Sequence, residues 1–473
     1  VGAIRTVLSD DVLRTRLISS ARRHAEENFT ADAMSTAYAA LWSGIDSSRG
    51  RRTRPRSAPH DTAGPVNRKD HSGAPRILLI TDRKPGMDTG YGMRIANVVA
   101  GLRHVGDLHV CLVDSSYGGE SLPRDGGYTT SVVRALDPSR LSKLVRTAVS
   151  IPDLTYRRAK EVRSDLTDAV GGEVWDLVWC SRIRMHRLSC GIVEGARIVD
   201  FDDMNDLLLR TRIKDRTARS GWLSASPRNL ADALNVRRWS RLQRSIAEQA
   251  ERVVVCCEAD RIHLGVSDAA IVPNGYRIRS SLARASVPDR PTLLFVGPLT
   301  YEPNRLAAEW MSYEVLPRVR ACVPEARLVV VGRSHGRSER LRHVDGVELL
   351  GYVDSVEPHY SSASLAVAPL WSGSGTSLKA IEALAYSVPL VSTSFGCRGL
   401  NVEHGVELLV ADDITSFAEH CVRVIRDPDF ARQLAARGHT RYRAGLTAEM
   451  SSAAVAAVAS DVMSKPARSG SRS

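Results

Sequence analysis

Short apolar runs alternate with stretches of helical periodicity along most of this chain. Each run is ended by turn-forming residues, which is typical of strands buried in a parallel sheet. Strands that alternate with helices predict a doubly wound α/β sheet. The runs form two series, which comprise residues 76–82, 108–113, 177–179, 198–199 and 253–256, then residues 293–297, 327–333, 347–353, 365–370 and 389–391. Two domains, each with its own sheet, are therefore predicted.

The turn Pro273-Asn274-Gly275 separates the two series. Proline, asparagine and glycine favour turns for different backbone reasons, so the turn is a natural boundary. A chain of 473 residues is also too long for a single core. We expect the first domain at residues 75–274 and the second at residues 275–440. A closing helix at residues 441–464 and a disordered polar tail at residues 465–473 would follow.

The segment before the first series divides into two parts. Residues 1–46 have helical apolar spacing, whereas residues 47–74 are polar and strongly basic, which predicts a disordered linker. The helical part matches a second segment near the other end of the chain, with one single-residue gap. Arg5, Asp11, Arg14, Leu17, Phe29, Thr30 and Asp32 fall opposite Arg423, Asp429, Arg432, Leu434, Leu446, Thr447 and Glu449. The match indicates a repeat or chance similarity between two helices rich in arginine and alanine.

Composition narrows the class of protein. Hydrophobic content of 43% and charged content of 25% are ordinary for a soluble protein. No run approaches the roughly 20 apolar residues of a membrane span, and the start has no signal-peptide core. The eight cysteines form no CxxC pair, which favours reduced thiols in the cytoplasm.

The net charge of +12 lies largely in the predicted linker, which has no interleaved aromatic residues. Nucleic-acid binding is therefore the least favoured function. Further basic residues fall on the predicted helices within residues 134–163 and 210–244. They are either solvated helix faces or a surface that attracts anionic lipid headgroups at the inner membrane face or a lipid-diphosphate acceptor.

Residues 371–393 carry the clearest chemistry. Gly373 and Gly375 form a turn that enters an apolar helix containing Lys379 and Glu382, and a strand follows. The free N–H groups of a helix start can hold a phosphate, and glycines let that phosphate approach closely. Lys379 would add positive charge, and Glu382 would accept hydrogen bonds from hydroxyls. A plain glycine loop with a solvated helix is the alternative.

This stretch resembles the donor-sugar signature of the GT-B glycosyltransferases of group 1, family 4, and the resemblance extends over roughly residues 75–450. It implies two Rossmann-like parallel-sheet domains that face a cleft, with extra N-terminal helices. It also implies retaining transfer from a nucleotide-sugar co-substrate, with no metal and no other cofactor. The implied donor-binding residues are Gly297, Arg333, Gly373, Ser374, Gly375, Thr376, Lys379 and Glu382.

The chain departs from the family at two places. Ser374 stands where many members have a glutamate, and neither arginine nor lysine follows Gly297 at the usual place. Lys379, Arg333 or Arg305 would have to compensate the charge of the diphosphate. Residues 1–46 resemble the closing helices of the same family, so we expect them to be the tail of a preceding module.

The acceptor side is expected at two loops of the first domain. Gly90, Gly92 and Arg94 belong to a glycine loop that leads into a helix at residues 93–102, where a phosphate site and simple turn chemistry are both open. Asp202 follows a strand, at the edge of the sheet where ligands bind. It is the candidate group near the acceptor hydroxyl, with a helix cap as the alternative. The residues expected to carry catalysis are Asp202, Lys379 and Glu382.

The family resemblance predicts a glycosyltransferase that acts on a glycan or lipid-linked acceptor, as in bacterial polysaccharide biosynthesis. Two other functions remain open. The missing bases and Ser374 favour a catalytically inactive relic that binds a nucleotide-sugar or a partner subunit. A nucleotide-sugar 2-epimerase shares the fold, but the sequence offers no clear set of ionisable groups for it.

Overall fold

The computed structural model describes residues 73–86, 89–114, 126–134, 159–220, 227–278, 290–373 and 375–465. The chain divides into residues 1–71 and 72–473, and all described residues belong to the second unit. The predictions for residues 1–46, for nearly all of the linker and for all but one residue of the tail lie outside the described residues, and so does Ser374.

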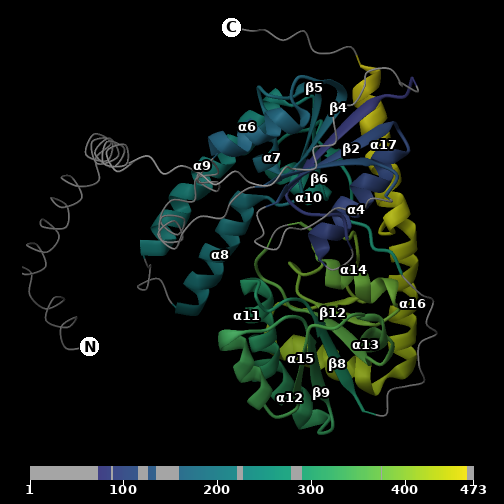
Figure 1. The fold of residues 1–473 in the computed structure, drawn as a ribbon. Coiled ribbons are helices and arrows are strands. Elements are labelled where there is room, and N and C mark those ends of the chain that lie inside the picture. The colour runs from purple at the N-terminus through teal and green to yellow at the C-terminus, as the bar shows by residue number, and fades with distance from the viewer. Residues whose placement is uncertain are drawn as a thin grey trace, which may run out of the picture. The chain divides into compact units, whose positions relative to one another are not determined.

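The first lobe is built on a seven-stranded sheet in which every strand pairs in parallel with its neighbours (Figure 1). The strand order is β3-β2-β1-β4-β5-β6-β7. The strands are β1 (Arg76–Thr81), β2 (Asp107–Asp114), β3 (Thr129–Arg134), β4 (Val174–Ser181), β5 (Glu194–Phe201), β6 (Arg252–Val255) and β7 (Ala270–Ile271). The described helices are α4 (Gly90–Arg103), α6 (Ala159–Val170), α7 (Ile183–Ser189), α8 (Asn205–Ser220), α9 (Pro227–Gln249) and α10 (Glu258–Leu264). The doubly wound sheet predicted for this half is confirmed.

The second lobe repeats this architecture with six parallel strands in the order β10-β9-β8-β11-β12-β13. The strands are β8 (Thr292–Val296), β9 (Arg327–Val331), β10 (Val347–Gly351), β11 (Leu365–Ala368), β12 (Leu390–Ser392) and β13 (Leu409–Val410). The helices are α11 (Glu302–Trp310), the π-helical η3 (Met311–Val315), α12 (Leu316–Cys322), the 3-10 helix η4 (Gly336–His343), α13 (Glu357–Ser361), α14 (Leu378–Ala385), α15 (Ile414–Arg426), α16 (Pro428–Gly445) and α17 (Ala448–Ser464).

Helices bury both faces of each sheet, which is why the strands read as continuous apolar runs. In the first lobe one face packs against α6 to α10, and the other packs against α4 and α17. In the second lobe α11, η3, α12 and α15 cover one face, whereas α13, α14 and α16 cover the other. Among the described helices, none is both long and apolar enough to cross a membrane.

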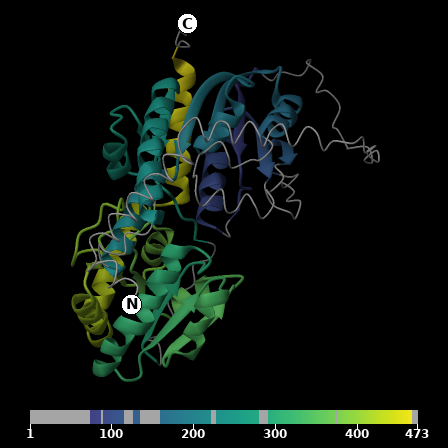
Figure 2. The same cartoon turned by 90° about the vertical axis from the view of Figure 1, so that its left-hand side faces the viewer.

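The chain crosses between the lobes twice, at neighbouring places. The Tyr276 N–H donates to the Leu446 carbonyl at 2.9 Å, and the Ala448 N–H donates to the Tyr276 carbonyl at 3.0 Å. Here α16 ends beside the second sheet and α17 continues beside the first, as two views show (Figures 1 and 2). The expected boundary after residue 440 therefore falls inside α16.

Two details differ from the sequence-based expectation. Strands β3, β7 and β13 were not predicted, and β7 and β13 have only two residues each. Helix α4 begins at Gly90, three residues before the predicted start, because the Thr89 hydroxyl caps it by accepting from the Gly92 N–H. Gly90 and Gly92 thus belong to the first helical turn and not to the loop before it.

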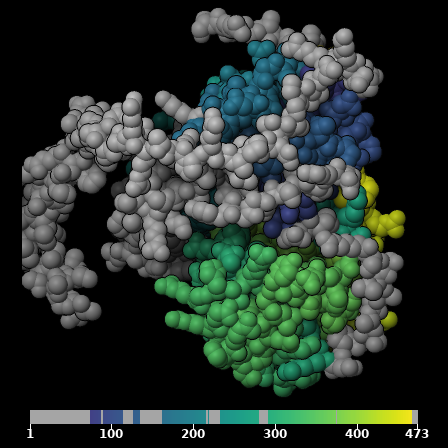
Figure 3. Space-filling model, viewed as in Figure 1, coloured from purple at the N-terminus to yellow at the C-terminus, as the bar shows by residue number. Residues whose placement is uncertain are grey.

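Each sheet reverses its strand order at one point, between β1 and β4 and between β8 and β11. Ligands of open α/β sheets bind outside the carboxyl ends of the strands at such a switch point. The surface of the second lobe is seen below that of the first in the space-filling view (Figure 3).

Candidate active site

A cavity of about 540 Å³ lies where the two lobes meet. Its walls come from segments that follow β1, β4 and β5 in the first lobe and β8, β10 and β11 in the second. Pockets of this size, with a few convergent polar groups, are typical ligand sites. The predicted site residues that line it are Gly90, Asp202, Gly297, Gly373, Gly375, Thr376, Lys379 and Glu382.

The turn before α14 is shaped by glycine. Gly375 has a φ of 67°, in the left-handed region that favours glycine, and a Cβ added there would lie 3.0 Å from the Asp202 carbonyl oxygen. The turn therefore fits closely against the first lobe. Ser377 is the N-cap residue of α14, and both it and Leu378 line the cavity, so the start of the helix faces the cavity.

Lys379 places a cation in the wall of the cavity. Its ammonium donates to the Asn304 amide oxygen at 3.0 Å and lies 5.4 Å from the centre of the Phe295 ring. Burial lowers the pKa of Lys379 to about 8, although Glu382 acts in the opposite direction. Because its protein partners are a neutral amide and a ring, the charge is available to an anionic ligand.

Glu382 lies one helical turn beyond Lys379 and is 5% exposed. Its Oε2 accepts from the Tyr360 hydroxyl at 2.9 Å. Burial raises the pKa of Glu382 to about 7, and the Tyr360 hydrogen bond and Lys379 oppose that rise.

A cluster of tyrosines supports this wall. The Tyr360 and Tyr386 rings stack at 5.1 Å, and the hydroxyls of Tyr276 and Tyr386 are 2.8 Å apart. The Tyr386 hydroxyl also donates to Glu357 at 3.1 Å. Glu357 and Glu382 therefore each hold a tyrosine hydroxyl and both border the cavity.

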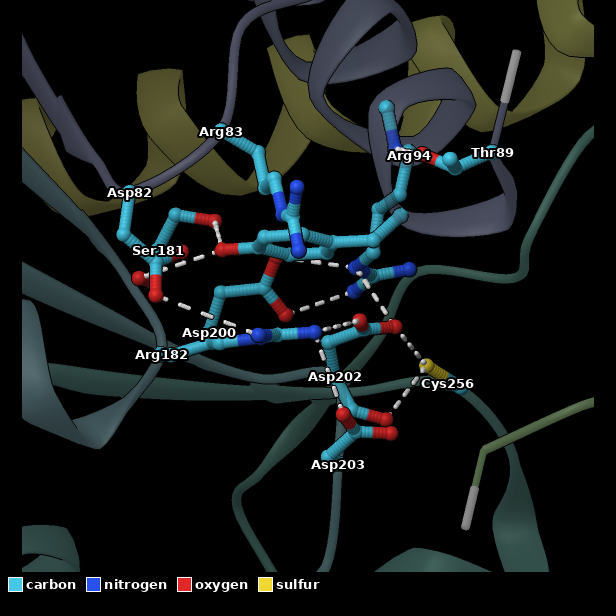
Figure 4. Close-up of polar contacts among 12 residues, drawn as sticks. Asp82, Arg83, Thr89, Arg94, Ser181, Arg182, Asp200, Asp202, Asp203 and Cys256 are labelled. Carbon is cyan, nitrogen blue, oxygen red and sulfur yellow. Dashed lines mark hydrogen bonds and ion pairs between the residues drawn. The ribbon is translucent and has the colours of Figure 1, made fainter. Parts of the chain in front are cut away.

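The opposite wall, in the first lobe, contains a dense set of charges (Figure 4). The buried Arg94 guanidinium makes two hydrogen bonds to Asp200, at 2.9 and 2.6 Å. It also donates to the Val272 carbonyl at 3.1 Å and to the Asn274 amide oxygen at 2.8 Å. Arg94 was expected beside a ligand phosphate, but it does not line the cavity, because it is held within the lobe.

Asp202 and Asp203 lie at the cavity surface after β5, and Arg182 follows β4. Arg182 lies 3.1 Å from Asp203 and 3.8 Å from Asp202 (Figure 4). Its guanidinium also covers the Tyr91 ring at 3.5 Å. Burial raises the pKa of Asp202, Asp203 raises it further, and Arg94 and Arg182 lower it. Asp202 is thus a carboxyl that can hold a proton near neutral pH.

Three other predicted residues lie elsewhere. Gly92 lies in the first turn of α4, where an added Cβ would meet the Gly86 carbonyl oxygen at 3.0 Å. Arg333 is exposed and lies over the Tyr352 ring at 4.9 Å. Arg305, which was considered as a substitute cation, forms an ion pair with Glu309 at 2.7 Å. The structure therefore brings together one lysine, four glycines, Thr376 and two carboxyls from the predicted set.

Sequence reasoning missed Arg182, Glu357 and the tyrosines. Arg182 has a φ of 75°, which is uncommon for a residue with a side chain and often marks a functional site. A signal for it did exist, because it directly follows the β4 strand in the way that Asp202 follows β5. The tyrosines had no such signal, because their contacts join residues far apart in the sequence.

The described residues include no group of three or more His, Cys, Asp or Glu side chains arranged to hold a metal ion. The expectation of a donor site without a metal or cofactor stays a prediction.

Residues 290–427 match the family described as glycosyl transferases group 1. This segment of the second lobe is therefore similar to group 1 glycosyltransferases, and the two lobes together have the GT-B fold. A protein of Klebsiella pneumoniae described as an uncharacterized 44.6 kDa protein in the cps region is 26% identical over 152 residues. That match spans 30% of this chain and 39% of the relative, so it covers less than half of the relative's length.

Solved structures match the GT-B fold of this chain over most of their length. Sucrose-phosphate synthase from Thermosynechococcus elongatus superimposes with a TM-score of 0.60 at 17% identity and covers 82% of this chain and 99% of its own. The Anabaena protein HepE in complex with UDP-glucose gives 0.56 at 14% identity, over 82% of this chain and 100% of its own. A mutant of S. aureus TarM in complex with fondaparinux, α-GlcNAc-glycerol and UDP gives 0.57 at 9% identity, again over 82% and 100%. At these identities the likeness establishes the fold alone.

Proposed function

We propose that this chain is a glycosyltransferase that moves a sugar from a nucleotide-diphosphate sugar to an acceptor hydroxyl with retention of configuration. The observation that carries the proposal is the cavity at both switch points, where a glycine turn, a helix start, Lys379 and Glu382 converge. The family match over residues 290–427 includes all of these groups.

The second lobe would bind the donor. N–H groups at the start of α14 and the Lys379 ammonium would stabilise the negative charge of the diphosphate, which grows as the bond from the sugar to phosphate breaks. Glu382 would accept hydrogen bonds from ribose hydroxyls with the oxygen that Tyr360 does not occupy. Gly373 and Gly297 leave room for the ligand, and both line the cavity. HepE, whose fold matches, was solved with UDP-glucose, which agrees with this type of donor.

The first lobe would bind the acceptor. The acceptor oxygen forms a bond to the sugar while the bond from the sugar to the diphosphate breaks. The nucleoside diphosphate leaves with the electron pair of that bond, and the acceptor proton passes to the departing diphosphate oxygen or to water. Asp202 lines the cavity, and its backbone carbonyl oxygen packs against the Gly375 turn that precedes α14. We assign Asp202 to orient the acceptor hydroxyl. A glycan or lipid-linked acceptor agrees with the glycans bound by TarM and with the relative in a cps region.

A donor screen tests the proposal. The purified chain is incubated with UDP-, GDP- and ADP-sugars and an acceptor extract, and release of nucleoside diphosphate is followed. Release with one donor should be lost in Lys379→Ala and Glu382→Ala and retained in Glu419→Ala, which changes an exposed glutamate of α15 outside the cavity. The anomeric configuration of the product, measured by NMR, then tests retention.

The same screen separates the alternatives. Lys379 and Arg182 are the only lysine or arginine side chains among the described residues that line the cavity, which favours an inactive relic to some extent. Binding of a nucleotide-sugar without turnover would establish the relic. We do not expect the sugar nucleotide to be converted into its epimer. Such conversion, with no net release of nucleoside diphosphate, would favour the epimerase alternative.

A basic face of α9 supports peripheral contact with an anionic membrane. Arg237, Arg241 and Arg244 are exposed and lie on one side of the helix at spacings of four and three residues, near the exposed Leu234. Each basic residue near an anionic surface contributes about 1 kcal/mol of attraction. Changing the three arginines to glutamine should abolish sedimentation with phosphatidylglycerol vesicles. The same change at Arg318, Arg432 and Arg443 should have little effect.

A further inference from the structure

A chain of hydrogen bonds runs from the core of the first lobe into the turn of the second. The Arg94 Nη1 donates to the Asn274 Oδ1 at 2.8 Å, and the Asn274 Nδ2 donates to the Thr376 Oγ1 at 2.9 Å. Asn274 belongs to the segment that leads from the first lobe to the second. These two hydrogen bonds thus connect the buried Arg94 cation with Thr376, which lines the cavity.

The direction of these bonds is fixed by their chemistry. A guanidinium can only donate, so the oxygen of the Asn274 amide must face Arg94 and its NH2 group must face Thr376. Arg94 cannot turn away easily, because Asp200 accepts two of its N–H groups and the Val272 carbonyl accepts another. The orientation of the Asn274 amide is therefore set by its partners.

The Thr376 hydroxyl then keeps its hydrogen available for a further acceptor at the cavity. Its oxygen accepts from Asn274, and among the described residues it donates to no other atom. Thr376 lines the cavity between Gly375 and Lys379, the groups assigned to the diphosphate. Hydrogen bonds to charged oxygens are about twice as strong as those between neutral groups.

We propose that Arg94 and Asn274 are positioning residues, which set the Thr376 hydroxyl as a hydrogen-bond donor to the diphosphate of the donor sugar. This inference rests on the proposed function. It gives Arg94 a role in donor binding although Arg94 does not line the cavity. It also makes the anion site depend on contact between the lobes, because Asn274 ends the first lobe and Thr376 belongs to the second.

The test is Asn274→Asp, which keeps the shape of the side chain and reverses its polarity toward Thr376. One carboxylate oxygen still accepts from Arg94, and the other accepts from Thr376, which turns the hydroxyl hydrogen away from the cavity. Affinities for UDP, GDP and ADP and for the three corresponding nucleosides are measured by calorimetry. Affinity for the preferred diphosphate should fall by about tenfold or more, as the loss of one charged hydrogen bond implies, whereas nucleoside affinity stays within about twofold.

The Thr376 variants separate the relay from simple repulsion by the new carboxylate. Thr376→Val should lower the affinity for the diphosphate as much as Asn274→Asp does. Thr376→Ser keeps the hydroxyl and should retain wild-type affinity. In the Thr376→Val background, Asn274→Asp should have no further effect; a further tenfold loss would show repulsion and overturn the relay.

Asn97→Asp is the matched control, because Asn97 Nδ2 donates to the Gly275 carbonyl at 2.8 Å without reaching Thr376. It should leave the ratio of diphosphate to nucleoside affinity unchanged. Equal losses of both affinities in Asn274→Asp would also overturn the relay. If the wild type binds nucleosides but prefers no diphosphate, the proposed function itself fails, and the relay fails with it.

Discussion

The two walls of the cavity differ in how their charged side chains are partnered. In the second lobe the charged groups are left available: Lys379 contacts a neutral amide and a ring, and Glu382 is held by a single tyrosine hydroxyl. In the first lobe Arg94 and Asp200 satisfy each other, and Arg182 lies among several carboxylates. One wall keeps charge for a ligand, while the other uses most of its charge to hold its own shape. Substitutions in the second lobe should therefore affect binding with little loss of stability, whereas removal of the Arg94 and Asp200 pair in the first lobe should lower stability as well.

The largest effect is expected from Arg94→Met. It would leave the buried Asp200 carboxylate without its two hydrogen bonds, and breaking a buried pair costs about 3–5 kcal/mol. The free energy of unfolding, measured by urea denaturation, should fall by that amount. Arg318→Met, at an exposed ion pair with Glu314, should cost about 0–1 kcal/mol. Equal effects of the two changes would contradict the contrast between the walls.

Lys379→Met should show the reverse behaviour. The rate constant kcat/KM for the preferred donor should fall about a hundredfold, which is about 2.7 kcal/mol of transition-state stabilisation. The free energy of unfolding should not fall, because folding removes the ammonium from water and its direct contacts are a neutral amide and a ring. Lys465→Met, at an exposed lysine paired with Asp461, should leave kcat/KM unchanged. A marked loss of stability in Lys379→Met would assign the lysine a structural role.

Gly375→Ala tests the place where the walls meet. The left-handed φ of 67° should cost alanine about 1–2 kcal/mol of stability, and its Cβ would lie 3.0 Å from the Asp202 carbonyl oxygen. Gly265→Ala is a matched control, since its φ is 71° but no atom lies within 4 Å of the added Cβ. Both variants should lose similar stability in urea, and Gly375→Ala alone should lose donor affinity. Unchanged donor affinity would separate the turn from the donor site.

The smallest effect is a narrow pH optimum for donor binding. Burial raises the pKa of Glu382 to about 7 and lowers the pKa of Lys379 to about 8. In the proposed donor site the ribose needs an ionised Glu382 and the diphosphate needs a protonated Lys379, so affinity should rise through about pH 7 and fall above about pH 8. Calorimetry from about pH 5.5 to about pH 9.5 would measure both limbs. Glu382→Gln should remove the acidic limb and keep the alkaline one; an unaltered acidic limb would assign it to another group.

The sequence by itself determined the α/β class, two parallel sheets and the glycine turn that enters α14. These features depend on patterns within a few residues: apolar runs mark buried strands, and Gly373, Gly375, Lys379 and Glu382 lie within ten residues of one another. The wall of the second lobe could be predicted for this reason. Short strands such as β7 and β13 could not, because two residues carry no periodic signal.

Only the tertiary structure decided the wall of the first lobe and the way the walls meet. Arg94 and Asp200 are 106 residues apart, and Asn274 and Thr376 are 102 residues apart. Asp202 carried a local signal, since it follows a strand, but the pKa of its carboxyl depends on Arg94, Arg182 and the depth of burial. Whether a charged side chain is available to a ligand depends on which partners the fold brings to it. Those partners come from distant segments, so no local pattern in the sequence specifies them.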